Sequence, residues 1–134
     1  MTPATYLRIL PSGNVLIGKT SQTNSNYMLD VNGNVRASQV TVNTTGADYV
    51  FDPGYSLMSL PDLEKYLQSR HHLPGIASAQ EMSERGLDVG ETQKLLLQKV
   101  EELTLYMLAQ QKQIGQLERQ NKKLERMLKK SSNR

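Results

Sequence analysis

The run from Gly13 to Thr20 (Gly-Asn-Val-Leu-Ile-Gly-Lys-Thr) has the residue types and spacing of a phosphate-binding loop. In such a loop, backbone N–H groups and the lysine hold phosphate, and a helix begins directly after the motif. Here Val-Leu-Ile is typical of a strand, and the polar run 21–26 does not resemble a helix start. The sequence therefore matches the motif without its context, and we expect no nucleotide site.

The histidine pair His71 and His72 is the next group that could hold a ligand. Neighbouring residues on a helix point about 100° apart, so they chelate poorly compared with histidines spaced i, i+4. We interpret them as the end of a helix before the turn Leu73-Pro74-Gly75, and we expect no metal and no cofactor.

The acidic residues also show no spacing typical of a catalytic pair, and most fit helix caps or solvated faces. They are Asp48, Asp52, Asp62, Glu64, Asp88, Glu91, Glu101 and Glu102.

Composition excludes several classes of protein. The 134 residues include no cysteine, which excludes disulfide and thiolate chemistry, and the formal net charge is +3. No apolar run approaches the roughly 20 residues that span a bilayer, so we expect no membrane insertion. We also expect this stretch to be the C-terminal part of a longer protein.

Basic residues concentrate at the C-terminal end. They could attract an anionic partner, but we favour a solvated helix surface with cations near the helix C-terminus. Nucleic-acid binding is not expected, because no aromatic residue follows Tyr106 to accompany these cations. The basic residues are Lys112, Arg119, Lys122, Lys123, Arg126, Lys129, Lys130 and Arg134.

The first 47 residues read as short strands and turns, and we assign 1–47 to a β-rich segment. Apolar runs at 6–10, 15–18 and 27–31 alternate with turn residues. Asn32-Gly33 predicts a tight hairpin leading into a strand at 35–37. Strand character continues through Val40 and Val42.

Residues 48–91 predict a small helical head. Ser59 and Asp62 are placed to begin one helix, which should end near His71. Ser78 and Glu81 form a second capping box, and the helix that they begin should end at Gly86. Leu-Asp-Val-Gly-Glu (87–91) then leads into a third helix.

Residues 92–130 predict a coiled coil, followed by a disordered tail at 131–134. Apolar residues recur at spacings of three and four over more than four heptads. Such a rod cannot be buried by a chain of this size, so we expect it to associate with other chains. The a positions are Val100, Met107, Ile114, Asn121 and Leu128, and the d positions are Leu96, Leu103, Gln110, Leu117 and Leu124.

The start of this helix is apolar on further sides, at Leu97 and Tyr106 among others, so the head should cover it. We expect residues 52–90 to wrap the beginning of the bundle and a bare coiled coil to project from about Gln110. The residues that we assign to this packing are Leu60, Leu63, Tyr66, Leu67, Leu95, Leu105 and Leu108.

Asn121 at an a position is common in dimers, whereas Gln110 at d and the mixed seam also suit trimers, and the seam does not decide between them.

A family resemblance favours the trimer. The runs 13–20 and 29–37 resemble repeats of phage tail fibres and large surface proteins of Bacteroidetes. The runs 48–57, 72–76 and 96–106 resemble the module at the C-terminal ends of those proteins, which is related to the chaperone-of-endosialidase group. The resemblance implies an α+β homotrimer, with a β-rich shaft end, a helical head and a parallel trimeric coiled coil. It also implies a location on a virion tail fibre or a bacterial surface.

Some members of that group cleave themselves at a serine followed by aspartate. No serine here is followed by aspartate, and Ser38, near the corresponding junction, is followed by Gln39. We therefore expect a non-catalytic module that assembles the trimer and sets its register. The alternatives are a self-cleaving chaperone domain, a fibre tip that binds a host receptor or glycan through loop 21–26, and a dimeric coiled-coil regulator with a basic tail.

Overall fold

The structure, a computed structural model, describes residues 6–132 and has an α+β fold. It contains a three-stranded sheet, a short 3-10 helix and three α-helices, the last of which is long. The expected α+β class is confirmed. The chain divides into two compact units, one ending at Thr41 and one beginning at Val42. Within the predicted tail, Ser131 and Ser132 continue the last helix, whereas residues 133–134 lie outside the described residues.

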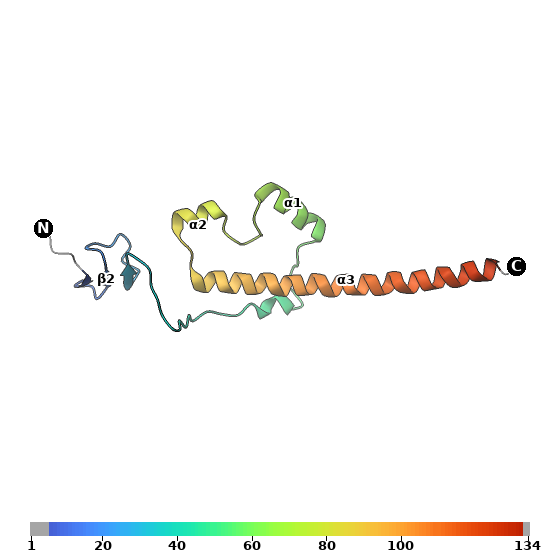
Figure 1. The fold of residues 1–134 in the computed structure, drawn as a ribbon, viewed down its shortest axis with the longest axis horizontal. Helices are drawn as coiled ribbons and strands as arrows, with labels where there is room; N and C mark the ends of the chain where they lie inside the picture. The colour runs from blue at the N-terminus through green and yellow to red at the C-terminus, as the bar shows by residue number, and fades with distance from the viewer. Residues whose placement is uncertain (1–5, 133–134) are drawn as a thin grey trace. The chain divides into compact units, whose positions relative to one another are not determined.

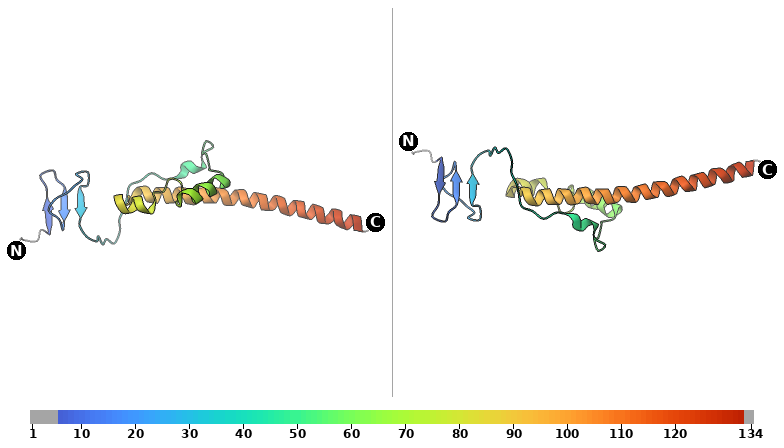
Figure 2. Two further views of the ribbon diagram at one scale, coloured as in Figure 1. Left: turned by 90° about the horizontal axis from the view of Figure 1, so that it is seen from above. Right: turned by 90° about the horizontal axis from the view of Figure 1, so that it is seen from below.

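The first unit contains the sheet. Strands β1 (Leu7–Ile9), β2 (Val15–Ile17) and β3 (Leu29–Val31) lie in the order β1-β2-β3, as Figure 2 shows. β1 and β2 pair antiparallel, and β2 and β3 pair parallel. A tight turn joins β1 to β2, in which the Gly13 N–H donates to the Leu10 carbonyl and Gly13 adopts a φ of 89°, which suits glycine.

Asn14 organises the connection between β2 and β3. Its Nδ2 donates to the carbonyls of Ser25 (2.9 Å) and Tyr27 (2.8 Å), and its Oδ1 accepts from the Ser12 hydroxyl. The side chain is buried, as is Leu16 on β2, which is fully shielded from solvent. A buried amide bonded on both its ends fixes the path of the loop over the sheet.

The hairpin predicted at Asn32-Gly33 is wrong, since no strand follows Val31 in the described part of this unit. Asn32 extends the pairing with β2 instead. Its backbone N–H donates to the Ile17 carbonyl (2.9 Å) and its Nδ2 donates to the Gly18 carbonyl (3.2 Å). A turn-forming residue used as a strand-end contact cannot also reverse the chain, and residues 34–46 have no regular structure.

The second unit begins with a 3-10 helix, η1 (Asp48–Phe51), followed by α1 (Leu60–Arg70) and α2 (Ala79–Arg85). Both short helices have the predicted starts. The Ser59 hydroxyl accepts from the Asp62 N–H, and a complete capping box joins Ser78 and Glu81. α1 ends at His71, which takes a left-handed conformation, and α2 ends at Gly86. Local capping rules therefore set both helices.

The long helix α3 runs over Val89–Ser132, and at 1.5 Å per residue its 44 residues extend about 66 Å. The Asp88 carboxylate accepts from the Glu91 N–H (2.9 Å) and caps its start. Gly90 in the first turn is buried, and a Cβ there would lie 2.8 Å from Val42 Cγ1. The core of this unit therefore lies where residues 42–50 cross the beginning of α3, with Ala47 and Val50 buried.

We expect Asn14→Ala to destabilise the first unit by about 1–3 kcal/mol, because the two loop carbonyls would lose a buried donor. Hydrogen exchange of the backbone amides in β2 and β3 measures this local free energy. Asn34→Ala is the matched control, since Asn34 is exposed and makes no side-chain hydrogen bond within the described residues. Equal protection of β2 and β3 in the two variants would contradict the role assigned to Asn14.

Candidate functional site

The predicted seam of α3 is exposed along its whole length. Every a and d residue from Leu96 to Leu128 is solvent-exposed, including Gln110 and Asn121. The exposed fraction is 46% at Leu96 and 69% at Leu128. Leu97, at an e position beside the seam, is also exposed. An uncovered aliphatic stripe this long is unusual for a single chain in water.

The rest of the chain covers the first part of α3 on the side opposite to the a/d stripe. Between residues 92 and 106, the half-buried residues occupy the b, c, f and g positions of the heptad, and all a, d and e positions are exposed. The predicted packing residues Leu95 and Leu105 lie on the half-buried side, whereas Leu108 is exposed. The molecule thus covers the outer face of the helix and leaves the a/d stripe free.

The cover comes chiefly from η1 and the segment after it. η1 packs directly on α3, while α1 and α2 run alongside the first half of the helix without close backbone contact in the described chain (Figures 1 and 2). Leu95 shares a small hollow with Ile76, Met82 and Leu87 at the end of α2. Of the predicted packing residues on α1, Leu63, Tyr66 and Leu67 are half-buried and Leu60 is exposed.

Hydrogen bonds of three tyrosine hydroxyls join residues 49–58 to α3. The Tyr49 hydroxyl donates to Gln98 Oε1 (2.7 Å), and the Tyr55 hydroxyl donates to Glu102 Oε1. From the helix side, the Tyr106 hydroxyl donates to the Met58 carbonyl (2.5 Å). Positions 98, 102 and 106 are spaced by four, so they lie along one side of the helix. We call these contacts the tyrosine clasp.

Glu102 is the charged centre of the clasp. Besides Tyr55, its carboxylate accepts from Lys99 Nζ (2.9 and 3.0 Å) and Gln98 Nε2 (2.8 Å). Burial alone would raise the pKa of Glu102, but the hydrogen bonds from Tyr55, Lys99 and Gln98 outweigh it and lower the pKa. Burial and the hydrogen bond to Glu102 raise the pKa of Tyr55 to about 12. The clasp therefore holds an ionised carboxylate and a neutral phenol.

The pKa of the neighbouring Glu101 is shifted in the opposite direction from that of Glu102. Its Oε2 is buried and has no hydrogen-bond partner among the described residues. This burial, together with the negative charge of Asp48, raises the pKa of Glu101. Protonation of Glu101 therefore removes its repulsion from Asp48 in η1, whereas protonation of Glu102 weakens its contact with Tyr55.

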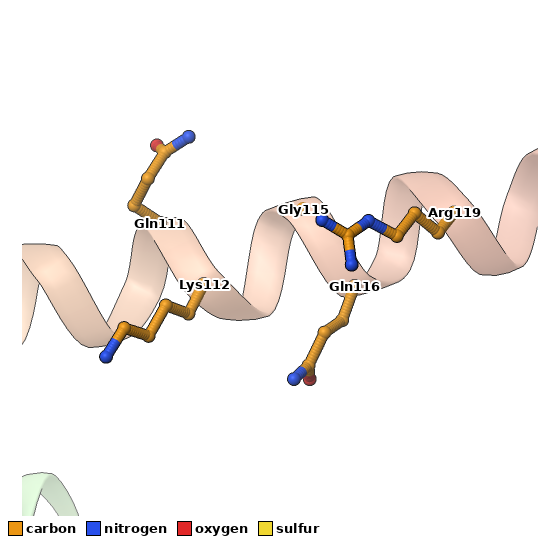
Figure 3. A pocket seen from close by; sticks show the side chains of 5 residues that line it. All are labelled: Gln111, Lys112, Gly115, Gln116 and Arg119. Atoms are coloured by element: carbon orange, nitrogen blue, oxygen red, sulfur yellow. The ribbon is translucent and has the colours of Figure 1, made fainter.

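A shallow hollow lies on α3 at Gly115, a b position (Figure 3). It exists because glycine leaves a gap between Gln111 and Arg119, and the Arg119 side chain lies back along the helix toward it. All of its lining residues belong to one exposed helix face, so it does not enclose a ligand.

The basic residues of the C-terminal half share this outer side. All of those described lie at b, c or f positions, away from the a/d stripe, and none forms an ion pair within the described residues. They are Lys112, Arg119 and Arg126 at f, Lys122 and Lys129 at b, and Lys123 and Lys130 at c. Arg134 lies outside the described residues.

Residues of the run 13–20 and of the histidine pair make contacts within the fold. In the run resembling a phosphate loop, residues 15–17 form β2, no helix follows within residues 20–28, and Lys19 Nζ lies 2.6 Å from Asp30 Oδ2. The ring of His72 packs edge-on against Tyr66, with 5.7 Å between centroids. No group of three or more His, Asp or Glu residues is placed to hold a metal in the described chain.

Comparisons with protein-family models, curated proteins and solved structures gave no match. Among residues 6–132, no helix is both long and apolar enough to cross a membrane.

Sequence reasoning found the stripe but missed the tyrosine clasp. The clasp joins residues 43 to 49 positions apart, and no local pattern marks such a pair. A weak signal was available, because Tyr49 and Tyr55 are aromatic residues in a segment that has no periodicity of its own.

We expect Tyr55→Phe to destabilise the unit by about 1.5–3 kcal/mol at neutral pH, the range for a hydrogen bond to a charged group. A lowered carboxyl pKa stabilises the fold above the ordinary carboxyl pKa, and this contribution is lost as the pH falls through the lowered value. The difference between parent and variant in urea unfolding should therefore shrink on acidification. Tyr49→Phe is the control, since its partner Gln98 is neutral, and its smaller effect should persist in acid. A pH-independent effect of Tyr55→Phe would contradict this account.

Proposed function

We propose that this chain is a non-catalytic assembly module that brings three copies together through a parallel coiled coil of α3. The observation that carries the proposal is the position of the tyrosine clasp. It lies at c, f and g positions, on the side of α3 that the chain half-buries, and the a/d stripe remains in water. An uncovered stripe of this length is best explained by helices of other chains.

The first part of the stripe suits three copies. Leu97 at e widens the apolar surface, and Thr104 and Gln111 at the following e positions carry no charge, whereas Glu118 and Glu125 at the last two e positions do. In dimeric coiled coils the e and g positions are often charged and form interhelical pairs. The family resemblance supports the same number of chains.

The proposed mechanism begins with the stripe. The residues Leu96, Val100, Leu103, Met107, Ile114, Leu117, Leu124 and Leu128 lose their water only when the helices meet. Association there gathers the upstream segments of the three chains and lowers the entropic cost of their later contacts. Gln110 and Asn121 disfavour slipped registers, because a slip would bury each of them against an aliphatic layer.

We propose that the module works at the end of a virion tail fibre or a fibrous bacterial surface protein. This placement is supported by the resemblance of residues 13–110 to such proteins. The proposal assigns no peptidase activity, since no Ser-Asp pair occurs in the sequence.

Light scattering of the parent chain should give about three times the chain mass of 15.1 kDa, unchanged on dilution. Leu103→Lys/Ile114→Lys should reduce this to one chain, because buried lysines in the a and d layers would lack partners. Leu108→Lys/Gln116→Lys is the matched control, with the same charges added at b and c positions, and should keep three chains. An intact oligomer in the seam variant would overturn the proposed interface. A parent mass of two chains would instead favour the dimeric regulator.

Asn121→Ile should raise the thermal stability of the oligomer, since a polar layer at an a position fixes register at a cost in stability. The same variant should populate more than one oligomeric state, which native mass spectrometry would resolve. Asn121→Gln is the control, because it retains an amide in the layer. A variant that is more stable and still uniformly trimeric would show that Asn121 does not select the register.

A further inference from the structure

The sheet of the first unit has one face made only of aliphatic side chains. Paired residues in neighbouring strands point to the same side of a sheet, so the register decides which residues share a face. Leu7 pairs with Ile17 and Ile9 with Val15, while Val15 and Ile17 also pair with Leu29 and Val31. The aliphatic face therefore consists of Leu7, Ile9, Val15, Ile17, Leu29 and Val31.

The opposite face is closed by the chain itself. It carries Arg8, Leu16 and Asp30, and Leu16 is fully buried there. Arg8 donates to the Thr20 carbonyl (2.8 Å), and Asp30 pairs with Lys19 from the loop between β2 and β3. The loop thus supplies both the polar contacts and the cover on this side.

The aliphatic face is more open in the described residues. Leu7, Ile9 and Leu29 are each more than half exposed and Ile17 is also exposed, whereas Val15 and Val31 are half-buried. In an ordinary half-buried sheet the apolar face packs on the core and the polar face meets water. In the described part of this unit, the aliphatic face is instead the more exposed of the two. Within the described part of this unit, residues 32–41 do not close it, since all of them are exposed.

The composition of the face favours copies of itself as the occupant. The face bears no charge or hydrogen-bonding side chain that would select a different partner. Related copies present the same six aliphatic residues, and the proposed coiled coil holds those copies at high local concentration. Pairing through strand edges between chains is disfavoured, because β1 and β3 have only three residues each.

We propose that the aliphatic face of the β1-β2-β3 sheet packs against the same face of the other copies in the assembly. This is a second self-association surface, built from side chains, with each chain keeping its own strand pairing. Its use within a three-chain assembly rests on the proposed function. With strands about 4.8 Å apart, the face measures only about 10 Å on each side, so it depends on the coiled coil to bring the copies together.

Single cysteines test the proposal directly, since the chain has none of its own. Ile9→Cys places a thiol on the aliphatic face, and Arg8→Cys places one on the opposite face of the same strand. Under mild oxidation, we expect Ile9→Cys to form interchain disulfides at least about tenfold faster than Arg8→Cys, because proximity within the assembly raises the effective concentration. Leu29→Cys repeats the test from another strand in case Ile9→Cys does not fold.

The coiled-coil variant separates the two proposals. Ile9→Cys combined with Leu103→Lys/Ile114→Lys should lose its fast crosslinking, because the copies are no longer gathered. If the parent mass is three chains but Ile9→Cys, Leu29→Cys and Arg8→Cys crosslink equally, the face inference is overturned and the proposed function stands. If the mass is one chain, the proposed function fails, and a face-selective crosslink at high concentration would still support the face as a self-association surface. Without that selectivity, both fail.

Discussion

One carboxylate, that of Glu102, fixes which side of the long helix the rest of its unit covers. It receives hydrogen bonds from Tyr55, Gln98 and Lys99, and so ties a segment without regular structure to the outer side of α3. The carboxylate is half-buried, and its bond to Tyr55 is the one that joins it to the segment, so the segment cannot slide around the helix without losing that bond. The free a/d stripe is therefore a consequence of a polar contact on the other side of the same helix.

The two units share one property. Each closes one of its surfaces with its own polar contacts and leaves an aliphatic surface open: the stripe of α3 in one unit and the aliphatic face of the sheet in the other. Only five residues of the described chain are buried, namely Asn14, Leu16, Ala47, Val50 and Gly90. A single copy therefore buries little of its apolar surface, and this favours stability that depends on association.

Features that depend on neighbouring residues could be predicted from the sequence. The starts of α1 and α2 at Ser59 and Ser78, and the end of α1 near His71, follow from capping chemistry within one turn. The a/d periodicity of α3 is equally local. The clasp could not be predicted, because Tyr55 and Glu102 are 47 residues apart and only the folded chain brings them together.

In the sheet, a strong local signal gave a wrong prediction, because contacts distant in sequence decide the structure there. Asn32-Gly33 is a strong hairpin signal, but its backbone and side chain bond to β2, a contact set by the parallel register between β2 and β3. Which side chains share the aliphatic face also depends on that register, which the sequence pattern does not specify. Tertiary pairing here overrides a local preference.

The placement of the cations on α3 affects how two such helices interact when they approach each other sideways. Seven lysines and arginines lie on the b, c and f side of its last turns, while Glu118 and Glu125 lie at e positions beside the stripe. Two rods that approach each other sideways through these outer surfaces meet like charge, and at low ionic strength they repel. The same helix is therefore aliphatic along one side and cationic along the other, and the cationic side disfavours lateral sheets or bundles.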